Sequence, residues 1–244
     1  MSETTWHVTV YVFRQKGGKK GYYQSFKLDA NPDEYVLDLV ERIWAFHDRS
    51  LCFRHACHHS TCGACGMLVN GVEKLTCITS VRSVTKDGGS FKLDPLRNFP
   101  VVSDLAVDMG SFYANMEAAN GQQVLQLTDA CLPHEKHRQS EEYERLADCI
   151  ECGMCISACP VALTTPRYIG PAVLATIGQN LTIDKNAPEI CLADNVDGVW
   201  RCHSAYECSE VCPSNVDPGW RIMDLRRQVL INRIQSIFHP RKEA

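Results

Sequence analysis

Cysteines are the residues of this chain whose type and spacing point most directly to chemistry. The 244 residues include 14 cysteines, and most of them fall into three groups, at residues 57–77, 149–159 and 202–212. An even number could form a disulfide framework, but such frameworks belong mainly to short secreted chains that cannot bury a core. In a chain of this length, bunched thiols indicate metal ligation. We interpret the three cysteines outside the groups as structural thiols: Cys52, Cys131 and Cys191.

The first group has the spacing Cys-x4-Cys-x2-Cys-x11-Cys and consists of Cys57, Cys62, Cys65 and Cys77. Plant-type ferredoxins use this spacing to hold a [2Fe–2S] cluster. Three thiolates on one tight loop would wrap two irons, and Cys77, after the following hairpin, would close the cage. Gly63 and Gly66 have no side chains, so we expect backbone N–H groups to approach the cluster there.

Two other metal centres are alternatives for this group. A structural zinc ion could use the same four cysteines, although their asymmetric spacing is unusual for a zinc knuckle. A Rieske centre is suggested by Cys57-x-His59, but no Cys-x-x-His follows at Cys62 and Cys65.

The second group is a complete bacterial-ferredoxin run, Cys-x2-Cys-x2-Cys-x3-Cys-Pro, which ends at Cys159-Pro160. In such a run the fourth cysteine ligates the other cluster of a pair, so a second run is expected. It exists between Cys202 and Pro213, with Ala205 in place of its second cysteine.

Exchange of the fourth cysteines between the two runs predicts two clusters. The first would be a [4Fe–4S] cluster, ligated by Cys149, Cys152, Cys155 and Cys212. The second would have only three thiolate ligands: Cys159, Cys202 and Cys208. Because Ala205 cannot ligate iron, we expect this cluster to be [3Fe–4S] and to have the higher potential of the two. The alternative is that the cysteines of the third group are ordinary buried thiols.

The N-terminal part of the chain shows the periodicity of strands. Residues 6–13 and 22–28 alternate and would form a two-stranded ribbon. Residues 67–69 and 72–75 would form a second hairpin, because the intervening Asn70-Gly71 suits a type I′ turn.

Helical patterns appear once between these hairpins and throughout the C-terminal part. A helix is expected to start within Asn31–Glu34. One face of it would carry Val36, Leu37, Val40, Ile43 and Trp44. After about residue 105 strand alternation disappears, and Ile169–Ile177 is apolar enough for the start of a buried helix. Asp217-Pro218 would begin a final helix. Its apolar stripe would consist of Ile222, Leu225, Val229 and Ile234.

These patterns predict an α+β protein of two domains. Residues 1–105 would form a β-grasp plant-type ferredoxin domain with the [2Fe–2S] cluster. Residues 106–244 would form an all-helical bacterial-ferredoxin-like domain with the [4Fe–4S] and [3Fe–4S] clusters.

Composition excludes several classes of function. The formal net charge of −4 gives no indication of nucleic-acid binding. No run of about 18 apolar residues is present, so we expect no membrane span in this chain. The N-terminus lacks an export signal, which favours the cytoplasm or a comparable reducing compartment. We find no dinucleotide-binding loop, nucleophile elbow or paired carboxylates, and therefore expect no substrate chemistry in this chain alone.

The order of the three motifs resembles the iron–sulfur subunit of succinate dehydrogenase and fumarate reductase. Similar segments extend along essentially the whole chain: Arg54, Phe99-Pro100, Asp104-Leu105, Asp108-Met109, Tyr168–Pro171, Val199–His203 and Cys208–Pro213. The resemblance implies an electron-transfer subunit of a succinate:quinone oxidoreductase of the tricarboxylic acid cycle. Fumarate reductase would be the same relay run in reverse. A zinc-stabilised interaction protein is an alternative from another class.

The resemblance also implies partners. A flavoprotein subunit with FAD would dock on the N-terminal domain, and membrane anchor subunits on the C-terminal domain. The chain would then be peripheral, at the cytoplasmic face of the cell membrane. Electrons would pass between FAD and a membrane quinone.

Quinone contacts are implied near the three-iron cluster. Pro160 and His203 match positions that border the quinone pocket of the family, and Thr164 lies in a stretch where ubiquinone-reducing members have a tryptophan. The missing tryptophan favours menaquinone. For His203, a histidine hydrogen-bonded at a helix–loop interface is the alternative.

Three histidines surround the first cysteine loop. His58 stands where the family usually has arginine, and His55 and His59 are close in sequence. Their protonation near neutral pH would make the [2Fe–2S] potential pH-dependent. Solvated surface histidines are the alternative.

Overall fold

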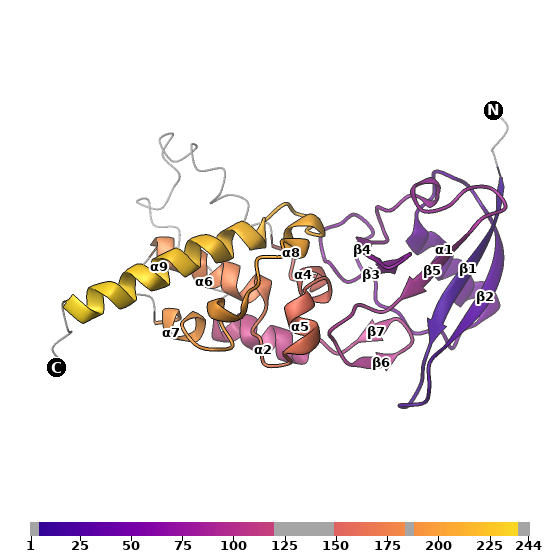
Figure 1. The fold of residues 1–244 in the computed structure, drawn as a ribbon. Helices are drawn as coiled ribbons and strands as arrows, with labels where there is room; N and C mark the ends of the chain where they lie inside the picture. The colour runs from indigo at the N-terminus through magenta and orange to yellow at the C-terminus, as the bar shows by residue number, and fades with distance from the viewer. Residues whose placement is uncertain (1–4, 120–148, 184–187, 239–244) are drawn as a thin grey trace. The chain divides into compact units, whose positions relative to one another are not determined.

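A computed structural model describes residues 5–119, 149–183 and 188–238 (Figure 1). Cys131, interpreted above as a structural thiol, lies outside these residues.

The chain forms two compact units. The first comprises Met1–Met109 and Ile150–Ala158, and the second comprises Gly110–Cys149 and Cys159–Ala244. The domain boundary at residue 105 stays a prediction.

The first unit is built on a five-stranded mixed sheet in the order β2-β1-β5-β3-β4. The strands are β1 (Trp6–Arg14), β2 (Tyr22–Ala30), β3 (Gly66–Val69), β4 (Val72–Leu75) and β5 (Ser90–Asp94). Strand β1 is antiparallel to β2 and parallel to β5, and β3 is antiparallel to both β4 and β5. Both expected hairpins are confirmed. Asn70 and Gly71 have φ of +52° and +82°, as a type I′ turn requires.

Helix α1 (Val36–Arg42) packs against this sheet but begins later than expected. Residues 31–34 form a turn instead, in which Asn31 Oδ1 accepts a hydrogen bond of 2.9 Å from the Asp33 N–H. The helix continues as a π-helical turn, η1 (Ile43–His47). Trp44 is 39% exposed, whereas the four residues expected to share its helical face are buried, so that placement of Trp44 was wrong. The wider π turn shifts residues out of the 3.6-residue register on which that expectation rested.

The core of this unit joins the alternating side chains of β1 to the buried face of α1. It includes Val8, Val10, Val12, Val36, Leu39, Val40 and Ile43. Beyond the sheet, β6 (Val101–Ser103) and β7 (Ala106–Val107) form a small antiparallel pair that sequence periodicity did not predict.

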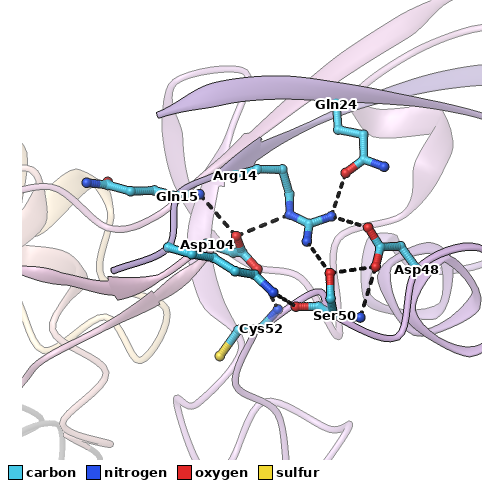
Figure 2. A network of polar contacts seen from close by, with 8 residues as sticks. Arg14, Gln15, Gln24, Asp48, Ser50, Cys52 and Asp104 are labelled. Carbon is cyan, nitrogen blue, oxygen red and sulfur yellow. Dashed lines mark hydrogen bonds and ion pairs between the residues drawn. The ribbon is translucent and has the colours of Figure 1, made fainter. Parts of the chain in front are cut away.

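A buried arginine at the end of β1 ties the sheet to the segment that leads into the first cysteine loop (Figure 2). The side chain of Arg14 is 3% exposed. Its Nη1 donates a hydrogen bond of 2.7 Å to Asp48 Oδ2, and its Nη2 donates one of 2.8 Å to Ser50 Oγ. Burial opposes the charge of Arg14, but hydrogen bonds to Asp48 and Asp104 outweigh it and raise its pKa.

Asp104 completes this network from the turn between β6 and β7. Its side chain is fully buried, and Oδ1 lies 3.1 Å from Arg14 Nε. Its two oxygens also accept N–H hydrogen bonds from Gln15, at 3.0 Å, and from Cys52, at 2.9 Å. Asp104 therefore fixes the backbone five residues before Cys57.

The segment Ile150–Ala158, which includes helix α4 (Met154–Ser157), is held within the first unit by polar contacts. Ser157 Oγ donates a hydrogen bond of 2.7 Å to Glu73 Oε1 on β4. The Asn98 amide donates one of 2.7 Å to the Ile156 carbonyl. These bonds hold Cys152 and Cys155 in the same unit as the first cysteine loop.

All secondary-structure elements that the structure describes in the second unit are helical. They are α2 (Gly110–Ala118), α5 (Pro160–Thr164), α6 (Pro171–Ile183), α7 (Ile190–Ala193), the 3₁₀ turn η5 (Val199–Arg201), α8 (Glu207–Glu210) and α9 (Pro218–Phe238). Figure 1 shows the long helix α9 beside α6, with which it packs.

Helix α9 begins at Pro218, as expected. Ile222, Leu225 and Val229 are fully buried, whereas Ile234 is 46% exposed and does not continue the stripe. None of the helices in the described part of the chain is long and apolar enough to cross a membrane.

Candidate metal centres

The structure describes thirteen of the cysteines, and none of these thirteen is part of a disulfide. No disulfide therefore competes for these thiols among the described residues, and the expected metal-ligating groups remain available.

The hairpin β3–β4 brings Cys65 and Cys77 together. Gly66 pairs with Leu75 at the open end of the hairpin, so Cys65 comes directly before one strand and Cys77 shortly after the other. Thr76 stabilises this junction, since its hydroxyl donates a hydrogen bond of 3.0 Å to the Cys65 carbonyl. The proximity of Cys65 and Cys77 could therefore be predicted from the hairpin alone, without knowledge of contacts between distant segments.

Backbone amides of the loop converge on Cys57. Its Sγ accepts N–H hydrogen bonds from His59, Thr61 and Cys62 at 3.4, 3.3 and 3.4 Å. Led by the bond from His59, they lower the pKa of the Cys57 thiol to about 6. Cys57 is therefore poised to be a thiolate at neutral pH, the form that binds metal.

Cys77 has the opposite electrostatic environment. Burial raises the pKa of its thiol to about 11, and the neighbouring thiols of Cys65 and Cys57 contribute in the same direction. The Ser60 N–H lies 3.4 Å from Cys77 Sγ and partly offsets these effects. Three of the four thiols thus interact electrostatically, and Cys62 interacts with Cys57. Four clustered thiols with inward N–H donors suit an iron–sulfur cluster, because such donors stabilise its negative charge.

The thiols of Cys159, Cys202 and Cys208 surround one hollow in the second unit. Ala205 also lines this hollow. Burial raises the pKa of Cys208 to about 12, and the nearby Cys159 and Cys202 add to this effect. The Ser204 N–H donates to Cys202 Sγ at 3.4 Å. Coordination to iron would replace the protons of these neighbouring thiols, so the donor set fits an iron–sulfur cluster.

Tyr168 lines the same hollow and was not predicted as a site residue. Its pKa is raised by burial and then by Cys202, Cys159 and Cys208. No spacing rule links Tyr168 to these cysteines. The only indication in the sequence was that residues 168–171 resemble a segment of the iron–sulfur subunit family.

The four cysteines expected to ligate the [4Fe–4S] cluster are divided between the two units. Cys149 and Cys212 pack against Ala175 and Val216 in the second unit. Cys152 and Cys155 belong to the first unit. The set of four ligands for a [4Fe–4S] cluster stays a prediction.

Pro160 and His203, two of the expected quinone contacts, line the hollow that holds the three thiols. The ring of His203 makes no hydrogen bond with any residue that the structure describes, and His203 is exposed. Thr164 ends α5 and is not part of this lining; its hydroxyl donates a hydrogen bond of 3.3 Å to the Val161 carbonyl.

Comparisons with known proteins agree with the order of these sites. Residues 7–114 match the family described as a 2Fe-2S iron-sulfur cluster binding domain, and residues 145–216 match the 4Fe-4S dicluster domain. The chain is 30% identical to the fumarate reductase iron-sulfur subunit of Mycobacterium tuberculosis, over 89% of this chain and 90% of that protein. It is also 30% identical to the succinate dehydrogenase iron-sulfur subunit of Coxiella burnetii, over 89% of this chain and 94% of that protein. A chain of the Mycobacterium smegmatis Sdh1 complex in the apo form shares the fold, with a TM-score of 0.77 and 24% identity. The match covers 95% of this chain and 98% of that chain.

Proposed function

Because the chain belongs to the family of iron–sulfur subunits of succinate dehydrogenase and fumarate reductase, we propose that it relays electrons through three clusters between a flavoprotein and a membrane quinone. Its role as an electron-transfer subunit follows from the family and from its 2Fe-2S and 4Fe-4S domains. The number and type of clusters, their ligands and the partners are the proposed part.

The observation that carries the proposal is the composition of the hollow in the second unit. Three thiols line it, and Ala205 lines it at the position where the run of cysteines would supply the next ligand. A methyl group cannot bind iron. This supports a [3Fe–4S] cluster ligated by Cys159, Cys202 and Cys208.

The other two clusters are assigned by spacing and by the gathering of thiols. The [2Fe–2S] ligands are Cys57, Cys62, Cys65 and Cys77. The [4Fe–4S] ligands are Cys149, Cys152, Cys155 and Cys212. When bound, such clusters each accept and donate one electron at a time. The chain holds the sulfur ligands in place, and around Cys57 it supplies three backbone N–H donors for their negative charge.

The partners follow from the family in the same way. A subunit carrying FAD would bind the N-terminal β-grasp domain, and anchor subunits would hold the all-helical domain peripherally at the cytoplasmic face of the membrane. The quinone, menaquinone in our proposal, would contact Pro160 and His203, with Thr164 close by on α5. The relatives include both succinate dehydrogenases and fumarate reductases, so the same relay serves either direction.

Low-temperature electron paramagnetic resonance on the air-oxidised, purified complex tests the proposal. Oxidised [2Fe–2S] and [4Fe–4S] clusters have no unpaired spin, whereas an oxidised [3Fe–4S] cluster has one. We expect a single signal, replaced on dithionite reduction by the spectra of the other two clusters. A silent oxidised complex with a full complement of iron would refute the three-iron assignment.

A further inference from the structure

Three side chains that no cluster assignment uses converge beside the first cysteine loop. Glu41 is the penultimate residue of α1, and His55 and His58 lie on either side of Cys57 in the first cysteine loop. Glu41 Oε1 lies 3.0 Å from His55 Nδ1 and 3.1 Å from His58 Nε2. The two imidazole nitrogens are 3.2 Å from each other. These three atoms form a nearly equilateral triangle.

The size of this triangle matches that of metal ligands. Zinc binds imidazole nitrogen and carboxylate oxygen at about 2.0–2.2 Å. Neighbouring ligands at such distances are about 2.9 Å apart in octahedral geometry and about 3.4 Å apart in tetrahedral geometry. The three observed separations fall between these values, so one cation could reach all three donors with little movement.

Hydrogen bonding alone leaves the arrangement incomplete. Glu41 Oε1 is shielded from solvent, and no described residue gives it a well-aligned hydrogen bond. His55 Nδ1 and His58 Nε2 both face Glu41 Oε1 and are also 3.2 Å from each other. If both nitrogens carried a proton toward the carboxylate, the two protons would lie too close together. A buried carboxylate oxygen without a good donor is costly, and a cation between the three atoms would remove that cost.

We propose that Glu41, His55 and His58 bind a divalent cation of the zinc class, with water in the remaining coordination positions. Two imidazoles and one carboxylate suit zinc and neighbouring transition metals, whereas magnesium and calcium prefer sites made of oxygen alone. The side chains of His55 and His58 are 41% and 43% exposed, which leaves room for water and a path for entry.

The surrounding structure holds the two imidazoles in place. Phe53 stacks on the His55 ring, with centroids 5.0 Å apart and planes at 20°. His58 has a φ of +61°, a left-handed conformation that turns the chain sharply directly after Cys57. A cation here would cross-link α1 to the first cysteine loop. The proposed zinc site contains no cysteine, so the test of zinc binding does not depend on which cysteines ligate the iron–sulfur clusters.

Zinc binding by the intact complex tests this inference. The complex is dialysed against a chelator, then equilibrated with Zn²⁺ alone, and zinc and iron are measured together by mass spectrometry. We expect one tightly bound zinc per chain at unchanged iron content. X-ray absorption at the zinc edge should show nitrogen and oxygen neighbours without sulfur.

Variants of the same complex locate the zinc. Loss of a residue that only hydrogen-bonds to a metal ligand weakens metal binding about 10- to 100-fold. Glu41 and His58 would be direct ligands, so Glu41→Gln and His58→Gln should each weaken zinc binding by at least this factor. His59→Gln is the matched control, because His59 is exposed on the same loop and contributes no donor atom to the triangle. Equal zinc affinity in all variants, or sulfur around zinc in the unmodified complex, would overturn the inference. The absorption measurement needs no variant and decides the question even where a variant fails to assemble.

Discussion

Gly63 lies so close to Cys152 that a β-carbon on the glycine would be 2.7 Å from the Cys152 β-carbon. It would also be 2.9 Å from the Cys152 α-carbon and 3.0 Å from the Ile150 carbonyl oxygen. Gly63 has a φ of +69°, which side chains rarely adopt. The first cysteine loop and the second cysteine run therefore meet, within one compact unit, at a residue whose conformation and close contacts favour glycine.

We predict that Gly63→Ala disrupts the first unit. The variant combines the cost of a left-handed alanine, about 1–2 kcal/mol, with a collision against backbone atoms that cannot rotate away. Thermal unfolding and iron content of the purified complex measure the effect. Gly71→Ala is the control, because Gly71 also has a positive φ, +82°, but no atom lies within 4 Å of its would-be β-carbon. Equal losses in the two variants would show that the contact with Cys152 is unimportant.

The buried pair of Arg14 and Asp104 leads to a second prediction. Asp104→Asn keeps the shape but leaves Arg14, with its 3% exposed side chain, short of one negative partner. Removal of one partner of a buried ion pair costs about 3–5 kcal/mol, so we expect a loss of this order in chemical denaturation. Asp29→Asn, which breaks the exposed pair with His7, should change stability little. A small effect of Asp104→Asn would mean that Asp48 alone suffices to neutralise Arg14.

Sequence spacing predicted those parts of the site that local structure determines. Cys65 and Cys77 flank a hairpin with an Asn-Gly turn, so their proximity follows from short-range rules. The central strand β5 was missed, although Phe91 and Leu93 alternate with exposed residues in it. Its parallel pairing with β1 joins residues about eighty positions apart, which periodicity does not encode.

Contacts between distant segments account for the other omissions. Glu41 meets His55 and His58 only because α1 packs where the cysteine loop begins, and Tyr168 meets its cysteines only in the folded second unit. Sequence alone offered solvated surface histidines as one interpretation; His55 and His58 are exposed, and both also lie close to Glu41 Oε1, at 3.0 and 3.1 Å. The predicted pH dependence of the first cluster stays a prediction.

The thiol environments of the first loop lead to a third prediction. In the chain freed of iron, Cys57 should become a thiolate above about pH 6, whereas Cys77 should stay protonated until about pH 11. The thiolate is the form that reacts with iodoacetamide. Mass spectrometry of chains labelled between pH 5 and 9 should therefore find Cys57 modified first and Cys77 protected. Labelling in urea, where all thiols react alike, is the control. Equal rates at the two cysteines without urea would contradict the difference in environment.

The last prediction concerns the residue at which the second run lacks a cysteine. Ala205 lines the hollow with Cys159, Cys202 and Cys208, so Ala205→Cys would place a fourth thiol among the three. We expect the variant complex to gain one iron per chain and to lose the unpaired-spin signal of the air-oxidised protein, because four thiolates complete a [4Fe–4S] cluster. Ala205→Val is the control, since valine fills similar space but cannot ligate iron, and it should retain the signal. If Ala205→Cys binds no further iron and keeps the signal, residue 205 does not reach the cluster, and the absence of a cysteine there does not explain a three-iron centre.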